Sequence, residues 1–219
     1  MQIEGTSSSS ATTSTTSNIR FGSISRSLSE TSTTDTEDQL NYIYREAVKL
    51  RKALESVEDN FRLRPDEEQN SVMSKTKADK IADLFKDAAD ALNNLFDDKK
   101  IQSSSNSDLK EFVSSMRDTL EAAVSDAFDS DSSNLQTDYG ITFDFSSSAR
   151  QVIDFSSLDQ NELIRKLTTD GSPVNELFYG RKTKDNDGLL ETISKSLDYI
   201  EANLKDILGT SGVFVDTNA

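Results

Sequence analysis

Two short acidic segments are the groups in the sequence whose residue types and spacing come nearest to a chemical site. The segments Asp129–Asn134 and Asp185–Gly188 both begin with alternating carboxylates, like oxygen-ligand calcium loops. An EF-hand loop also needs Gly at its sixth position and Glu at its twelfth. Neither segment has these residues at those positions. We therefore interpret both as solvated turns and expect no metal site.

The composition excludes most other chemistry. The chain of 219 residues has no His, Cys or Trp, which removes Ser–His and Cys–His nucleophile pairs and the usual zinc ligands. Neither GxGxxG nor GxxxxGK[ST] occurs, so no phosphate-binding loop is present. Paired carboxylates for glycoside hydrolysis arise by chance among 39 acidic residues, and no aromatic-rich pattern surrounds any pair. The sequence predicts a protein that is not an enzyme and carries no cofactor.

The charge balance restricts the partners. The 24 basic and 39 acidic residues give a net charge of −15, which disfavours nucleic acid because its binding requires clustered Lys and Arg. No stretch approaches the roughly 18 apolar residues of a membrane span. The N-terminus lacks the basic and apolar regions of a Sec signal. We expect no nucleic acid, no membrane insertion, and any export to use a route that does not read a Sec peptide.

The N-terminal segment 1–36 is rich in Ser and Thr, which account for 20 of its residues. So polar a segment buries too little apolar surface to offset the entropy of ordering its backbone. We predict a disordered leader over 1–36, either a solvated tail or an export signal or glycosylated stalk. Ile19, Phe21, Ile24 and Leu28 interrupt the polarity and are candidates for a short docking element.

A helix of about 25 residues is predicted from Asp38 onward, and Pro65 ends it. Thr34 or Thr36 can cap its start. Its apolar residues are spaced alternately by 3 and 4, which is an unbroken a/d heptad series. This seam is either a packing face inside the chain or a coiled-coil contact between chains. Its residues are the candidate association site: Leu40, Ile43, Ala47, Leu50, Leu54, Val57 and Phe61.

Further helices follow from the same helical periodicity. They are predicted at Lys75–Lys99, with Thr76 in a capping position, at 107–128 with Ser107 as cap, at Asp159–Leu167, at Pro173–Phe178, and from Leu189 to a stop at Gly209 and Gly212. The helix 107–128 has a wide apolar stripe that suits a central position. The first two long helices are expected to run antiparallel within one chain. The last helix is marked by Leu189, Ile193, Leu197, Ile200, Leu204 and Ile207.

The period drops to two between the helices 107–128 and 159–167. Ile141, Phe143 and Phe145 alternate with polar residues, and a second apolar group follows at 152–155. This pattern predicts a β-hairpin, which we expect to pack on the last helices. The predicted fold is therefore mainly α: an antiparallel helix bundle with a small β-hairpin over residues 37–219, preceded by the disordered leader.

The order of short motifs from about residue 78 to 215 resembles the C-terminal half of the bacterial flagellar filament cap family, also called hook-associated protein 2. In that family a GI-x-x-D, an LD-x-x-x-L-x-x-A-L, a V-x-x-L-F and a G-L helix follow one another. The matching segments here are Gly140–Asp144, Leu158–Leu167 with Lys166 in place of the Ala, Val174–Phe178 and Gly188–Leu190, after a helix that contains Met116-Arg117. The matched region looks like the helical and hairpin domain of the family, as a short or truncated variant.

The resemblance implies a structural protein of the bacterial flagellum that assists assembly and motility. It would be secreted without a Sec signal, pass through the cytoplasm before export, and lie outside the cell. Its partners would be flagellar axial proteins, namely flagellin or hook-associated proteins, or a second copy of itself. The alternative is a non-flagellar acidic helical interaction module, such as an adaptor, a chaperone-like protein or a secreted surface protein.

Overall fold

The computed structural model describes residues 23–30, 33–61, 73–96, 104–127, 143–146, 152–153, 160–169, 174, 178–179 and 188–210. Over these ranges the protein is mainly helical, which confirms the predicted class. β structure in the same ranges consists of one antiparallel bridge between Phe143 and Ile153.

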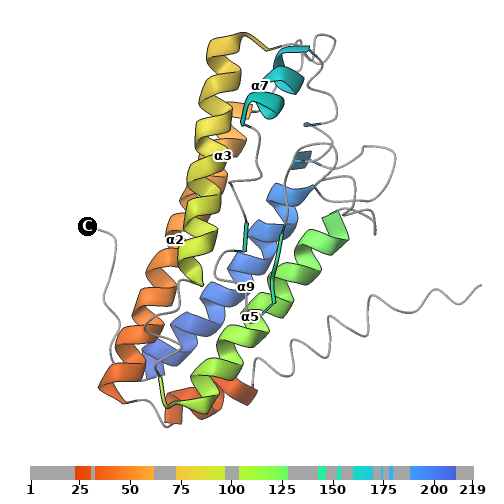
Figure 1. Cartoon of the computed structure of the whole chain (residues 1–219). Coiled ribbons are helices and arrows are strands. Elements are labelled where there is room, and N and C mark those ends of the chain that lie inside the picture. Colours follow the sequence, from red (N-terminus) through yellow and green to blue (C-terminus); the bar gives the residue numbers. More distant parts are fainter. Residues whose placement is uncertain are drawn as a thin grey trace, which may run out of the picture.

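The helices α2 (Thr34–Phe61) and α3 (Lys75–Leu95) lie side by side and run antiparallel (Figure 1). The Tyr42 hydroxyl donates to the Asn94 carbonyl over 3.1 Å, which joins the start of α2 to the end of α3. The apolar stripes of the two helices face each other because both repeat at helical spacing. The expected pairing of these helices within one chain is therefore observed.

The helix α9 (Leu189–Thr210) packs against α2 on one side and against α5 (Ser107–Ala127) on the other. Figure 1 shows α9 running opposite to both neighbours. The six residues that marked this helix in the sequence are all buried. The wide stripe of α5 is also confirmed: its buried apolar residues are Leu109, Phe112, Val113, Met116, Leu120, Ala123 and Val124.

The short helix α7 (Gln160–Thr169) lies beside the beginning of α3, at the upper end of the molecule in Figure 1. The Met73 amide, just before α3, donates to the Leu167 carbonyl over 2.9 Å. Leu163 and Leu167 of α7 are buried. This hydrogen bond attaches Met73 to α7, which lies more than 80 residues further along the sequence.

Helix starts differ from the predicted caps by one or two residues. Ser74, and not Thr76, caps α3, because its side chain accepts from the Lys77 amide. Asn106, and not Ser107, caps α5 by accepting from the amides of Asp108 and Leu109. An N-cap side chain must lie just outside the helix to reach these free amides.

The predicted leader contains structure. Residues 23–30 form a helical segment in which Ile24 and Leu28 are buried in the main hydrophobic cluster. The prediction of disorder over 1–36 is therefore wrong for 23–30, because two apolar side chains four residues apart find a packed surface that local composition does not reveal. It is also wrong for 34–36, which form the first turn of α2. The suggested docking element is observed at Ile24 and Leu28, whereas Ile19 and Phe21 lie outside the described residues.

The predicted hairpin is described only at 143–146 and 152–153. The Asp144 amide donates to the Val152 carbonyl over 2.8 Å, next to the Phe143–Ile153 bridge. The rest of the hairpin, most of the predicted helix Pro173–Phe178, the calcium-like segment Asp129–Asn134 and the stop at Gly212 lie outside the described residues. The last helix continues one residue past Gly209.

Candidate functional site

The seven seam residues of α2 lie on one side of the helix and are all buried. They belong to the same hydrophobic cluster as the inward residues of α3, α5 and α9. The structure thus brings the whole predicted association site together, but inside the chain. In this arrangement the seam serves intramolecular packing, and its use between chains stays a prediction.

An ion-pair network joins α2 to α9 beside the seam. Arg51 donates from Nε to Glu201 Oε1 over 2.7 Å, and its Nη1 pairs with Asp198. Glu201 is nearly buried, with 9 % of its side chain exposed, whereas Asp198 is exposed. Burial alone would lower the pKa of Arg51, but hydrogen bonds and charge from Glu201 and Asp198 raise the pKa above its ordinary value. These two ion pairs therefore fix the position of α2 along α9 at Arg51.

A second buried carboxylate on α2 is satisfied locally. Glu46 is buried, and its Oε1 accepts from the Lys49 ammonium over 2.6 Å. Lys49 remains exposed, so its charge stays in contact with water while one oxygen of Glu46 is paired. This arrangement follows the i,i+3 spacing of neighbouring positions on a helix surface.

Aromatic rings fill the end of the molecule where α2 finishes. The ring of Phe178 packs edge-on against Phe61, with centroids 5.1 Å apart, and lies 5.5 Å from Phe85. The Tyr179 hydroxyl donates to the Glu58 carbonyl over 3.1 Å. These contacts attach residues 178–179 to both α2 and α3.

Gly188 fits against this aromatic end because it has no side chain. A Cβ at Gly188 would lie 2.2 Å from the Phe178 carbonyl oxygen and 2.3 Å from the Tyr179 amide nitrogen. No other residue type can approach that backbone so closely. The start of α9 is thereby fixed against residues 178–179.

A polar clamp holds the bridged segments onto α3 and α5. The Asn93 side chain makes two hydrogen bonds to the backbone of Ile153, each over 2.9 Å. Its Nδ2 donates to the Ile153 carbonyl, and its Oδ1 accepts from the Ile153 N–H. Arg117 on α5 stacks on the Phe96 ring, 4.5 Å from its centroid, and donates to the Ser146 carbonyl over 3.2 Å. In the described residues of the predicted hairpin these polar contacts reach α3 and α5, and the packing of its apolar face on the last helices stays a prediction.

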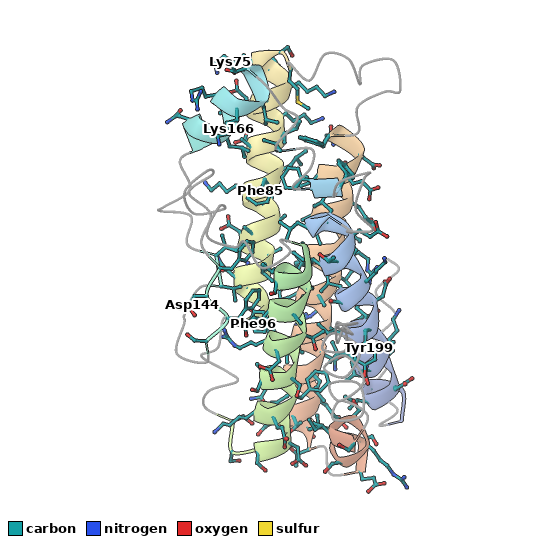
Figure 2. All side chains as sticks on the ribbon, turned by 90° about the vertical axis from the view of Figure 1, so that its right-hand side faces the viewer. Lys75, Phe85, Phe96, Asp144, Lys166 and Tyr199 are labelled. Carbon is teal, nitrogen blue, oxygen red and sulfur yellow. The ribbon has the colours of Figure 1, made fainter. Side chains whose placement is uncertain are left out.

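Asp144 lies next to this clamp, exposed and pointing away from the helices (Figure 2). Its carboxylate accepts from the Ser146 amide over 2.9 Å. Hydrogen bonds from the Ser146 side chain and amide, with a smaller contribution from the Arg117 charge, hold the pKa of Asp144 below its usual range.

A polar pocket of about 580 Å³ lies where α2 and α5 begin, lined by residues of 33–39 and 104–106. Asn106 bridges the two helix starts, because its Nδ2 donates to Thr36 Oγ1 over 3.2 Å while its Oδ1 caps α5. Asp35 and Asp38 are the carboxylates on the pocket wall. Within the described residues no group of three or more acidic side chains is arranged to hold a metal ion.

The helical segment 23–30 contributes contacts that sequence reasoning missed. Ser25 Oγ donates to Asn203 Oδ1 over 3.2 Å, and Ser27 Oγ donates to Asp108 Oδ2 over 2.6 Å. The apolar pair Ile24 and Leu28 was the signal available in the sequence. The sequence offers no comparable signal for the partners of this segment on α5 and α9, because Asp108 and Asn203 resemble ordinary surface residues.

Comparisons with protein-family models, with curated proteins and with solved structures found no match for this chain. Among the described helices, none has an apolar stretch long enough to cross a membrane.

Proposed function

We propose that this chain is a structural or assembly protein of the bacterial flagellum, related to the filament cap, which acts by association with axial subunits and not by catalysis. Its fold is an antiparallel helix bundle completed by a small β-hairpin. It acts outside the cell after export without a Sec signal. Its partners are flagellin, hook-associated proteins or a second copy of the chain.

One observation carries the proposal: two of the motifs that underlie the resemblance meet in space. The backbone of Phe178, from the V-x-x-L-F segment, touches Gly188, which opens the G-L helix. Leu167 of the preceding motif is buried and bonded to the chain before α3. If the motifs reflect a shared fold, contacts of this kind between them are expected.

A non-flagellar acidic interaction module is the second candidate, and the surface of α5 favours it. Glu111, Asp118 and Glu121 are exposed on its outer side, within a chain of net charge −15. Such a face attracts basic partners through interactions that salt weakens. This candidate needs no export and no filament.

Fractionation in the native host tests the flagellar proposal. The tagged full-length chain is expected in sheared filaments and in the culture medium, and removal of residues 1–22 is expected to reduce export. Retention of the intact protein in the cytoplasm of flagellated cells would contradict the proposal.

A salt series on captured complexes separates the two candidates. Association through apolar helix faces is expected to survive high concentrations of sodium sulfate, because kosmotropic salts strengthen apolar burial. Binding through the acidic face is expected to disappear at high salt. It should also be lost in a triple variant with Glu111→Gln, Asp118→Asn and Glu121→Gln, while Lys110→Gln on the same helix serves as control.

A further inference from the structure

The helical segment 23–30 lies on a surface formed by other parts of the chain, which we call the seat. The seat consists of Asp108 of α5, Asn203 of α9 and the edge of the hydrophobic cluster that Ile24 and Leu28 join. Leu28 is fully buried and Ile24 is 6 % exposed, and both face the hydrophobic cluster because residues four apart share one side of a helix. Ser23, Arg26 and Glu30 are exposed on the other side. Figure 1 shows the segment at the lower end of the molecule, beneath α5 and near the end of α9.

The seat has two polar positions, one on each helix. Asp108 in the first turn of α5 accepts from Ser27 over 2.6 Å, and Asn203 on α9 accepts from Ser25 over 3.2 Å. Each acceptor belongs to a long helix. On α9 the Asn203 Nδ2 donates to the Tyr199 carbonyl over 2.7 Å, which orients this side chain, and on α5 the Asp108 backbone amide donates to the capping Asn106 Oδ1 over 2.9 Å. Both polar groups of the seat therefore come from helices that the segment 23–30 is not part of.

The occupant is held less firmly than the long helices. A helix well below about 12–15 residues is not stable alone in water and depends on its docking contacts. Those contacts include the burial of Ile24 and Leu28 and the hydrogen bonds of Ser25 and Ser27, whereas the Arg26–Glu30 ion pair is exposed and contributes little. Segments with few buried contacts open at a lower free energy than the core. Uncovering the seat therefore requires only the local release of residues 23–30 and leaves the long helices packed.

We propose that this seat between α5 and α9 is a docking site for an amphipathic helix of a partner protein, which displaces residues 23–30. The partner helix carries apolar side chains at positions i and i+4, as Ile24 and Leu28 do, and a basic donor at i+3 where Ser27 lies. A Lys or Arg there meets the Asp108 carboxylate in a charge-assisted bond, which is stronger than the bond from a neutral hydroxyl. The net charge of −15 favours the approach of such a helix. The proposal rests on the proposed function in assigning the chain a role in association.

The test uses the full-length chain and a fluorescent peptide that corresponds to residues 20–33 with Ser27→Lys. Wild-type chain is expected to bind the peptide weakly, because its seat is occupied. A chain with Ile24→Ser and Leu28→Ser is expected to bind at least roughly tenfold more tightly, since the seat is then available. The same peptide with Leu28→Asp is the control and should not bind. Fluorescence anisotropy measures each affinity.

A second full-length variant keeps the test decisive if the double substitution unfolds the chain. Ser27→Glu sets a carboxylate against Asp108 and opens the seat without touching the apolar core, so it should also bind the peptide more tightly than wild type. Adding Asp108→Asn should remove the preference for the Ser27→Lys peptide over the unmodified peptide. If folded Ser27→Glu chain, checked by circular dichroism, binds no more tightly than wild type, the seat is not a docking site.

The outcome is independent of the test of the proposed function. Peptide binding by purified chain says nothing about export, so a cytoplasmic protein with an open seat would overturn only the flagellar assignment. A protein found in filaments whose Ser27→Glu variant fails to bind the peptide would overturn only the docking site.

Discussion

Asn93 supplies Ile153 with the two hydrogen bonds that a neighbouring strand would otherwise provide. The Asp144 amide bonds the Val152 carbonyl, so Phe143 and Ile153 form the non-hydrogen-bonded type of antiparallel pair. The amide and carbonyl of Ile153 must then point away from Phe143. The side-chain amide of Asn93 meets both, which closes the edge of this small β unit against α3.

Replacement of Asn93 by Ala is expected to lower the free energy of unfolding by about 1–3 kcal/mol, because two polar groups of the buried Ile153 lose their partners. Asn94→Ala is the matched control, since that side chain is exposed and is expected to change stability by less than about 0.5 kcal/mol. Urea denaturation of the two variants checks this. Equal losses would mean that the Ile153 backbone is satisfied by water.

Gly188→Ala and Gly209→Ala are expected to have opposite effects. A methyl group at Gly188 meets the Phe178 backbone at 2.2 Å, so the start of α9 must shift, at a cost of about 1–3 kcal/mol or more. At Gly209 the space is open, and Ala in a helix is favoured over Gly by up to about 1 kcal/mol. Thermal unfolding of both variants is the measurement, and a neutral Gly188→Ala would contradict the close approach.

Removal of the Arg51 charge strands Glu201 in a nearly buried position. Arg51 keeps 24 % exposure, so Arg51→Met is expected to cost about 1–3 kcal/mol, less than the loss of one partner in a fully buried pair. Combining it with Glu201→Gln should recover part of that loss. The two single variants and the double variant form a double-mutant cycle. The exposed pair Lys195–Glu191 is the control, and a double-mutant cycle on that pair should give a coupling free energy of about 0–0.5 kcal/mol.

Ser115→Ala is expected to stabilise the protein. The Ser115 Oγ is buried in α5 without a hydrogen-bond partner in the part of the chain that the structure describes, so its removal should recover about 0.5–1.5 kcal/mol of desolvation cost. Ser114→Ala, at an exposed position on the same helix, is the control for helix propensity. If the two variants gain equally in denaturant titrations, propensity alone explains the gain.

The stability at low pH is expected to report on Asp144. Its pKa is lower in the folded protein than in the unfolded chain, so its ionised form stabilises the fold above the unfolded pKa. That contribution is lost as the pH falls through the folded pKa. The difference in unfolding midpoint between wild type and Asp144→Asn should therefore be constant above about pH 5, shrink as the pH falls below the unfolded pKa of about 4, and vanish only once the pH lies below the lowered folded pKa. A difference that persists at the lower pH would mean that the charge of Asp144 is not its source.

The long helices could be predicted from sequence because their apolar residues repeat at helical spacing over many turns. Leu50 and Leu204 are examples whose burial follows from that repeat alone. The caps could not be fixed to one residue, since Ser74 and Thr76 both offer a hydroxyl near the same helix start. Only the free amide positions in the folded helix decide between them.

The contacts made by single polar side chains could not be predicted. Asn93 lies in a helix where the sequence gives no sign of a strand-like partner, and Ser27 lies in a tract whose composition indicates disorder. In both cases the deciding factor is a surface formed by residues distant in the sequence, namely Ile153 and Asp108. Local propensity carries no information about such surfaces.

The sequence separation of Arg51 and Glu201 delays their contact during synthesis. The two residues are 150 positions apart, whereas the Tyr42–Asn94 contact between α2 and α3 spans 52. At a translation rate of about 5–20 residues per second, Glu201 leaves the ribosome roughly 8–30 s after Arg51. The α2–α3 hairpin can therefore form while the face reserved for α9 is still bare. For that interval the apolar face of α2 that α9 later covers is exposed to solvent with the Arg51 charge beside it, and transiently exposed apolar surface of this kind is what chaperones protect from aggregation.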